Sequence, residues 1–380
     1  MKPTHDTEGN QETRLQALQA WLLRTPQAKQ GLFQSGFAME PASADASFRR
    51  YFRVWPQTAS TEEVTEAAHS MIVMDAPPDK ESVTAFVALS EQLDQLGLKV
   101  PRVLAKNVSE GFLLLTDLGQ HTLWDALQAL EPSQQTAFAD RWYQSGLATL
   151  VRLQTHPSPL KQTLPVYDAA LLAQEMDLFA DWLVVKHLDG TPWTQASASS
   201  SEAHASWQQL KRTLIDSAAA QPQTVVHRDY HSRNLMMPTA HTDRPDTLGV
   251  LDFQDAVLGP CTYDGVSLLK DCYLRWPRTQ IEDWLRWYFL ASVEAGLWMK
   301  KDWADCVRAF DLMGLQRHLK AAGIFARLYH RDAKAGYLKD LPNTLLYLHQ
   351  TARSYAHLPG VSGLLQRLDQ EVLPAMESLR

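Results

Sequence analysis

The stretch VVHRDYHSRNLMMPTAHTDRPDTLGVLDFQD, residues 225–255, decides the fold of this chain. Two short apolar segments, residues 224–226 and 248–251, are predicted to be strands, and a cluster of polar side chains follows each of them. The clusters are His227-Arg228-Asp229, with Asn234 five residues after the aspartate, and Asp252-Phe253-Gln254-Asp255. We expect a hairpin between the clusters, because an apolar strand at residues 235–237 is followed by polar residues 238–247.

This pair of clusters has the spacing of an H-R-D-x-x-x-x-N catalytic loop followed by a metal-binding turn similar to D-F-G, which is typical of phosphoryl transfer from ATP. Asp229 is predicted to accept the proton of the attacking hydroxyl. Asn234 and Asp252 offer the hard oxygen ligands that Mg²⁺ prefers, and His227 is predicted to support the loop. The alternative is that these are turn and cap residues. Two clusters after two apolar strands favour the catalytic interpretation.

Composition places the chain among soluble proteins with a large core. It has 380 residues, of which 45% are hydrophobic, and a net charge of −7 without a basic stripe, so we expect no nucleic-acid partner. The three cysteines form no C-x-x-C pair, as expected in a reducing compartment. No apolar run is long enough to span a membrane and the polar N-terminus is unlike a secretory signal. These features predict a cytoplasmic protein without a membrane partner.

Hydrophobic periodicity predicts an α+β, bilobal fold like that of protein kinases, with a strand-rich N-lobe at residues 1–116 and a mainly helical C-lobe at residues 117–380. In the N-lobe, a frayed tail at residues 1–12 and a helix from Leu15 to about Thr25 precede the sheet. Strands are expected at residues 48–55, 71–74, 102–106 and 112–116, with a helix at residues 81–97. Helices of the C-lobe are expected at residues 123–130, 136–154, 169–188, 203–220, 266–274, 280–299, 302–331 (with breaks), 341–356 and 361–379.

A nucleotide is expected in the cleft between the lobes, with its adenine against the backbone near Leu115 and Asp117. Two features of the N-lobe differ from the usual kinase pattern. Residues 42–47 read ASADAS instead of a glycine-rich loop, and the strand at residues 71–74 carries no lysine. We predict that Ser47 and Arg49 contact the phosphates instead. The alternative is that this arginine belongs to a solvated basic edge. Without the lysine, its glutamate partner cannot be assigned.

With this catalytic core and lobe order, the chain resembles the aminoglycoside phosphotransferase-like kinase superfamily over roughly residues 40–360. Longer segments are similar to the anomeric N-acetylmuramate/N-acetylglucosamine kinases of bacterial peptidoglycan recycling. These segments are DASFRRYFR at 45–53, VMDAPP at 73–78, EMDLFADW at 175–182 and DGVSLLKDCYLRWP at 264–277. The resemblance implies transfer of the ATP γ-phosphate to the C1 hydroxyl of an amino sugar. It also implies that Asp264 braces the catalytic loop.

The sugar must be recognised by the helical lobe, where the sequence is less informative. Carboxylates bond sugar hydroxyls, and a lactyl carboxylate would attract an arginine, for which Arg275 is our choice. The candidate substrate-binding residues are Glu175, Arg233, Asp271 and Arg275. Alternatively, Glu175 lies on a solvated helix face, and the aromatic residues Tyr273 and Trp276 are core packing.

Three functions remain open. Only six residues separate Asp252 from Gly259, which leaves no room for the activation loop of a protein kinase. The leading hypothesis is therefore a small-molecule kinase that phosphorylates an amino sugar at C1. An aminoglycoside 3′-phosphotransferase or a choline-type kinase is the second hypothesis, and a nucleotide-binding pseudokinase scaffold is the third. Retention of Asp229, Asn234 and Asp252 together argues against the scaffold.

Overall fold

The computed structural model of the chain describes residues 6–30, 32–33, 36–43, 48–57, 70–197, 201–239, 247–299 and 302–378. The chain divides into two compact units, residues 1–121 with 236–254 and residues 122–235 with 255–380. The first unit is rich in strands and the second is mainly helical, which confirms the predicted α+β class. The lobe boundary at residues 116 and 117 stays a prediction. The segment carrying Asp252 returns to the first unit.

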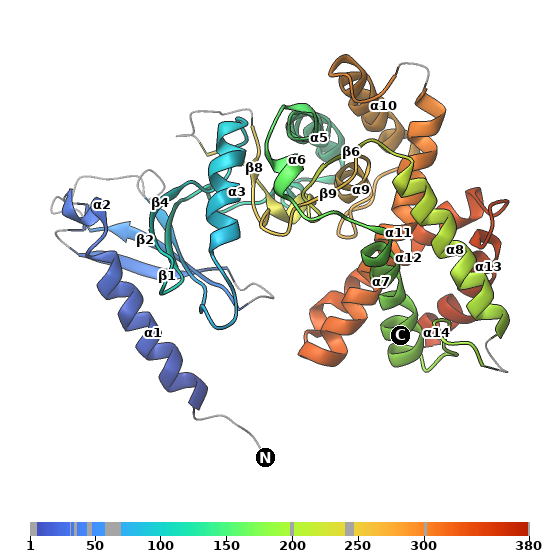
Figure 1. The fold of residues 1–380 in the computed structure, drawn as a ribbon, viewed down its shortest axis with the longest axis horizontal. Helices are drawn as coiled ribbons and strands as arrows, with labels where there is room; N and C mark the ends of the chain where they lie inside the picture. The colour runs from blue at the N-terminus through green and yellow to red at the C-terminus, as the bar shows by residue number, and fades with distance from the viewer. Residues whose placement is uncertain are drawn as a thin grey trace. The chain divides into compact units, whose positions relative to one another are not determined.

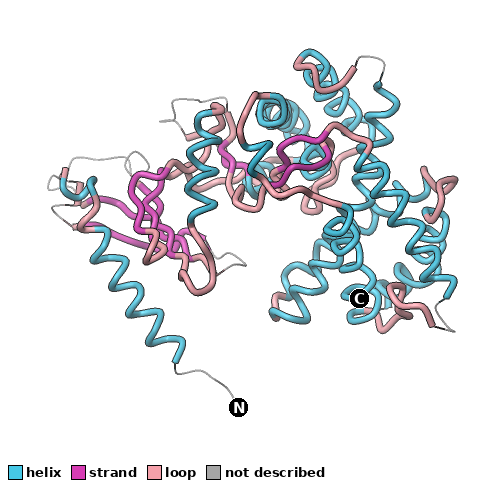
Figure 2. Tube along the Cα trace, in the orientation of Figure 1, coloured by secondary structure: helices cyan, strands magenta, loops and turns pink. Residues whose placement is uncertain are grey.

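The first unit is built on one antiparallel sheet (Figures 1 and 2). In the described part of the chain the sheet has five strands in the order β1-β2-β3-β5-β4. The strands are β1 (Phe37–Ser43), β2 (Arg50–Pro56), β3 (Met71–Asp75), β4 (Val103–Asn107) and β5 (Phe112–Thr116). All but β1 were predicted. Strand β1 contains Pro41, which argues against a strand, but β1 lies at the sheet edge, where a missing backbone N–H is tolerated.

Three helices of the described ranges belong to the same unit as this sheet, and the first of them begins earlier than predicted. They are α1 (Asp6–Leu22), α2 (Pro26–Lys29) and α3 (Thr84–Gln95). Residues 6–12, expected as a frayed tail, belong to α1. The helix is held because Leu18 and Leu22 are buried in a cluster that includes Val54 and Val73 of the sheet. Helix α3 confirms the predicted helix and buries Phe86 and its apolar neighbours.

The second unit consists of packed helices, with short strands at the catalytic segment. Its helical elements are α4 (Leu123–Gln128), α5 (Pro132–Thr155), α6 (Leu160–Thr163), α7 (Ala169–Leu178), the π-helix η2 (Phe179–His187), α8 (Ser201–Ala219), α9 (Tyr263–Leu269), α10 (Arg278–Glu294), α11 (Trp303–Asp332), the 3₁₀ helix η5 (Ala335–Asp340), α12 (Leu341–Ser354), α13 (Val361–Arg367), the π-helix η6 (Leu368–Val372) and α14 (Leu373–Ser378). The predicted helices are present. The region expected to contain breaks, residues 302–331, is the continuous helix α11.

Helix α11 organises the second unit, because α7, η2, α8, α9 and α12 all pack against it. It approaches α7 so closely that a Cβ on Gly323 would lie 2.3 Å from the carbonyl carbon of Leu178. Only glycine fits this crossing. Leu315 and Leu319 face the apolar core, while Arg317 and Lys320 on the same helix donate to the hydroxyls of Ser267 and Tyr263 on α9.

Two short sheets carry the catalytic segments. Strand β6 (Gln223–Val226) pairs antiparallel with β9 (Val257–Pro260), which was not predicted. Strand β7 (Leu235–Met236) pairs with β8 (Gly249–Val250). This pairing confirms the strands of the predicted hairpin, and residues 240–246 of its connection lie outside the described residues.

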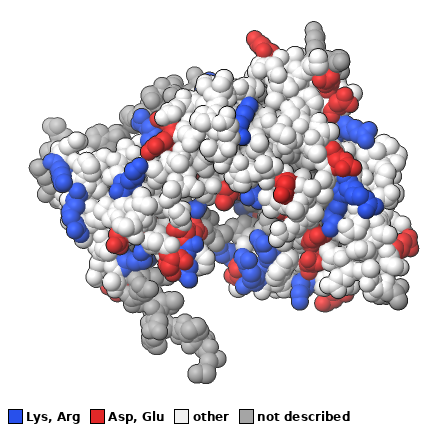
Figure 3. Space-filling model, viewed as in Figure 1, with Lys and Arg blue, Asp and Glu red and all other residues white. Residues whose placement is uncertain are grey.

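Charges are mixed on the surface. On the face drawn in Figure 3, Lys and Arg side chains are interspersed with Asp and Glu, and no broad patch of one sign is visible in this view. Within the described ranges, no helix combines the length and the apolar character needed to cross a membrane.

Candidate active site

The catalytic loop begins where β6 ends and is fixed by a buried carboxylate. The backbone N–H groups of His227 and Arg228 donate to the two side-chain oxygens of Asp264, at 2.7 and 3.0 Å. Asp264 is 0% exposed in the first turn of α9, and burial raises its pKa to about 6. These bonds are the contact that the sequence resemblance implies for Asp264.

Hydrogen bonds inside the loop orient its polar side chains. The Asn234 side-chain nitrogen donates to the backbone oxygen of Asp229 at 3.0 Å, so its amide oxygen is the atom that could ligate a cation. The backbone N–H of Asp229 donates to Nδ1 of His227 at 3.2 Å. His227 is buried, and its role as a support for the loop stays a prediction.

A cationic neighbour lowers the pKa of Asp229, the predicted base. Burial on its own would raise the pKa of Asp229, but the charge of nearby Lys320 is the largest opposing influence, and the pKa is held below its ordinary value. Asp229 is therefore a carboxylate at neutral pH, as a proton acceptor must be.

Both polar clusters contain a backbone conformation that L-residues rarely adopt. Arg228 has φ of 77° and Asp252 has φ of 62°. Among the described residues only two other non-glycine positions, Asp189 and Ala333, have positive φ. Such conformations persist where the surroundings impose them, and they concentrate at functional sites.

The turn predicted to bind metal is packed within the first unit. Phe253 is buried, and its ring centroid lies 4.9 Å from that of Phe86 on α3. The Gln254 side chain donates to Oδ1 of Asp252 at 2.6 Å. The carboxylate of Asp252 and the amide oxygen of Asn234 are both hard oxygen donors, so their chemistry fits Mg²⁺.

Arg49 in the first unit forms an ion pair with a residue that the sequence did not indicate as its partner. Nε of Arg49 lies 2.6 Å from Oε2 of Glu81, just before α3. The Arg49 side chain is only 11% exposed, so it does not belong to a solvated basic edge. Glu81 also accepts from the backbone N–H of Phe48 at 3.2 Å. Ser47, the other predicted phosphate contact, lies outside the described residues.

The two residues predicted to lie beside the adenine have structural contacts. Asp117 forms an ion pair with Arg53 at 2.5 Å and accepts from the Ser70 hydroxyl at 2.8 Å. Leu115 is buried in β5, paired with β3 and β4. Their contact with a nucleotide stays a prediction.

Two predicted sugar ligands have their carboxylates engaged by the chain itself. Glu175 is 5% exposed, pairs with Lys320 at 3.0 Å and accepts hydrogen bonds from Arg228 and Tyr167. The alternative of a solvated helix face does not hold for this residue. Asp271 accepts from the backbone N–H and hydroxyl of Ser232, at 2.9 and 2.5 Å, and from the backbone N–H of Tyr273. Both carboxylates brace the catalytic loop, a role that the sequence did not reveal.

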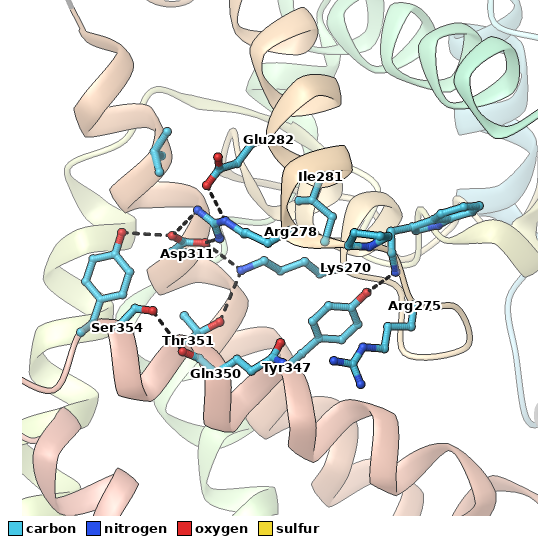
Figure 4. Close-up of a pocket in the computed structure, with 14 residues that line it drawn as sticks. Lys270, Arg275, Arg278, Ile281, Glu282, Asp311, Tyr347, Gln350, Thr351 and Ser354 are labelled. Atoms are coloured by element: carbon cyan, nitrogen blue, oxygen red, sulfur yellow. Dashed lines mark hydrogen bonds and ion pairs between the residues drawn. The ribbon is translucent and has the colours of Figure 1, made fainter. Parts of the chain in front are cut away.

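Arg275, our sequence-based choice for a substrate carboxylate, lines a pocket of about 950 Å³ in the second unit (Figure 4). The pocket lies among α10, α11 and α12. Three of its charged groups form a network, because Asp311 accepts from Lys270 at 2.7 Å and from Arg278 at 2.6 and 3.0 Å. Arg275 lies beside Tyr347, apart from this ion-pair network.

Comparisons with known proteins place the chain in a family. An N-acetylmuramate/N-acetylglucosamine kinase of Pseudomonas putida is 39% identical over 373 residues, which cover 96% of this chain and 98% of that protein. The kinase of the same name from Pseudomonas aeruginosa is 40% identical over 330 residues, 87% of this chain and 88% of the relative. The structure also resembles a choline kinase from Cryptosporidium parvum, with a TM-score of 0.53 and 10% identity over 94% of this chain and 100% of that one. At this identity the likeness shows the fold alone.

The model of the phosphotransferase enzyme family matches residues 38–300, a range that contains both polar clusters and the Arg49–Glu81 pair. Together with the two relatives, this match confirms the superfamily that the sequence motifs predicted. The chain belongs to the phosphotransferase enzyme family.

Proposed function

We propose that the chain is an ATP-dependent kinase that phosphorylates the C1 hydroxyl of N-acetylmuramate or N-acetylglucosamine, as part of peptidoglycan recycling. The names of the relatives that are 39% and 40% identical over most of the chain support this acceptor class. The observation that carries the proposal in the structure is the carboxylate of Asp229, held in a braced loop among cationic groups.

Asp229 orients the C1 hydroxyl and accepts its proton as the bond to phosphorus forms. An anomeric hydroxyl is more acidic than an ordinary alcohol, so a base with a low pKa suffices. Positioning provides much of the rate, since well-oriented groups contribute on the order of 7–11 kcal/mol in favourable cases. The bonds from Asp264 and Asp271 to the loop provide this positioning.

Asn234 and Asp252 would hold Mg²⁺, which when bound neutralises phosphate charge and orients the phosphates. Arg49 contributes a fixed positive charge to the nucleotide phosphates, in the role that a lysine has in protein kinases, and Glu81 orients it. Leu115 and Asp117 lie on the segment that contacts the adenine. Ser47 adds a phosphate contact from the preceding loop.

An aminoglycoside acceptor is less well supported. A polycation needs a densely acidic site, and Glu175 and Asp271 are already neutralised or hydrogen-bonded by Lys320, Arg228 and Ser232. A scaffold without catalysis is also disfavoured, because it would not need Asp229, Asn234 and Asp252 together.

A screen of ATP consumption tests the proposal. The acceptors are N-acetylmuramate, N-acetylglucosamine, kanamycin and choline, each with Mg²⁺. We expect turnover with one or both amino sugars and none with the cations. Turnover with kanamycin or choline alone would replace the proposal with the second hypothesis, and no turnover with any acceptor would favour the scaffold.

A further inference from the structure

A group of aromatic and polar side chains beside the catalytic loop has no role in the mechanism above. Its members are Trp124 on α4, His231 and Arg233 in the loop, Tyr273, and Asp340 at the end of η5. We call them the Arg233 cluster. They are in contact, because Arg233 lies over the rings of Trp124 and Tyr273 and the rings of His231 and Tyr273 lie 5.2 Å apart.

The guanidinium of Arg233 lies over two aromatic rings. Its central carbon lies 4.7 Å from the ring centroid of Trp124 and 3.6 Å from that of Tyr273. Its ion-pair partner among the described residues, Oδ2 of Asp340, is 4.0 Å away, which is beyond hydrogen-bond distance. The side chain is 27% exposed. An arginine held by contact with aromatic rings presents a planar fork that matches a carboxylate with two parallel bonds.

Three buried polar atoms of the cluster lack a hydrogen-bond partner among the described residues: Nε1 of Trp124, Nδ1 of His231 and Oδ2 of Asp340. Buried polar atoms are nearly always satisfied, so three such atoms around one arginine favour this cluster as a place where a polar ligand binds. One is a donor, one an acceptor, and the imidazole nitrogen can be either. A polyhydroxylated ligand, whose groups both donate and accept, meets this requirement.

We propose that the Arg233 cluster is the acceptor subsite, in which Trp124, His231 and Asp340 bind hydroxyl and amide groups of the sugar and Arg233 binds the lactyl carboxylate of N-acetylmuramate. The assignment rests on the proposed function. The cluster lies on the catalytic loop itself, since Arg233 follows Asp229 by four residues and the backbone N–H of His231 donates to the Asp229 carbonyl at 2.9 Å.

In this assignment Arg233, and not Arg275, is the residue that binds the substrate carboxylate. The acidic and basic groups near Arg275 are paired through Asp311, so its pocket offers no comparable set of unsatisfied atoms among the described residues. Arg233 discriminates between the two amino sugars, because only N-acetylmuramate carries the carboxylate. Asp340, Trp124 and His231 contact groups that both sugars share.

The test is kcat/KM for both sugars in the full-length protein. The variant Arg233→Met keeps much of the packing between the rings and removes the charge. We expect it to lose about 10- to 100-fold with N-acetylmuramate, the effect of a charge-assisted bond pair, and less than about 3-fold with N-acetylglucosamine. The matched control is Arg353→Ala, an exposed arginine on α12 outside the cluster, and it should leave both values unchanged.

Further variants separate the assignment from a loss of folding. Asp340→Asn should raise KM for both sugars equally, and the thermal midpoint of each variant verifies that it is folded. An equal loss with both sugars, or no loss, in folded Arg233→Met would overturn the assignment, as would a selective loss in Arg275→Ala instead. If the wild-type protein phosphorylates neither sugar, the proposed function fails and this subsite with it. If it phosphorylates both and Arg233→Met is not selective, only the subsite fails.

Discussion

The guanidinium of Arg49 is paired with the carboxylate of Glu81 at 2.6 Å, both of them largely shielded from water. The pair fixes a cation in the first unit, where strand β3 carries no lysine. A cation held in this way is suited to the phosphates of a nucleotide.

Arg49→Ala should raise the apparent KM for ATP by about 10-fold, because a charge-assisted contact to phosphate is lost. Glu81→Gln should produce a smaller increase, since the arginine remains but is less well oriented. Initial rates at varied ATP measure both. Lys106→Ala, which removes an exposed ion pair with Glu91 in the same unit, is the control. If Arg49→Ala and Lys106→Ala behave alike, Arg49 has no role at the phosphates.

Asp252→Asn should raise the Mg²⁺ concentration needed for half-maximal activity by about 10-fold or more, because an anionic ligand becomes a neutral one. Asn tolerates the positive φ of this position, so the backbone is preserved. A magnesium titration at saturating ATP makes the measurement, and chelation of the metal should abolish turnover in both proteins. The same half-maximal concentration in variant and wild type would remove Asp252 from the metal site.

Asp264 should make stability depend on pH in the acid range. Its pKa is about 6 in the folded protein because of burial, above its ordinary value of 3.8. The folded state therefore binds the proton more tightly, and the resulting stabilisation is present below pH 4 and lost as the pH rises through about 6. A difference of about 2 in pKa corresponds to about 3 kcal/mol.

Urea unfolding of wild type and Asp264→Asn at several pH values between about 4 and 7 tests this linkage. The free energy of unfolding of the wild type, relative to the variant, should decrease across this range. A constant difference between the two proteins would show that Asp264 does not titrate there.

Glu175→Gln should destabilise the protein, because it leaves Lys320 and Arg228 with an uncompensated buried charge. Burial alone would raise the pKa of Glu175, but Lys320 and Arg228 lower it, so the native residue is a carboxylate at neutral pH. Removing one partner of a buried pair costs about 3–5 kcal/mol. Urea unfolding measures the loss, with the exposed Glu91→Gln as control. Normal stability with a raised KM for the sugar would restore the sequence-based role of Glu175 as a substrate ligand.

Local patterns were sufficient to predict most of the fold. Helices α5 and α12 have apolar residues at helical spacing, and strand β5 is an apolar run. Each of these elements was therefore recognisable without tertiary information. Strands β1 and β9 were missed because Pro41 and Gly259 weaken their patterns, and pairing with β2 and β6 supplies what the local sequence lacks.

A fixed spacing was the sequence signal for Asp229, Asn234 and Asp252, and their roles at the candidate site stay predictions. The partners that come from distant segments of the chain could not be predicted from the sequence. Glu81 follows no motif, and the carboxylates of Glu175 and Asp271 looked available in the sequence but are engaged by Lys320 and Ser232 in the fold. Such pairings depend on how helices pack, which periodicity alone does not encode.

The position of the new phosphate tests the central claim most directly. Wild-type protein is incubated with ATP, Mg²⁺ and each amino sugar, and the product is examined by ³¹P and ¹H NMR. We predict a phosphate on C1, seen as coupling between phosphorus and the anomeric proton, and no such product from Asp229→Asn. A phosphate on any other hydroxyl, or the same product at full rate from Asp229→Asn, would contradict the account.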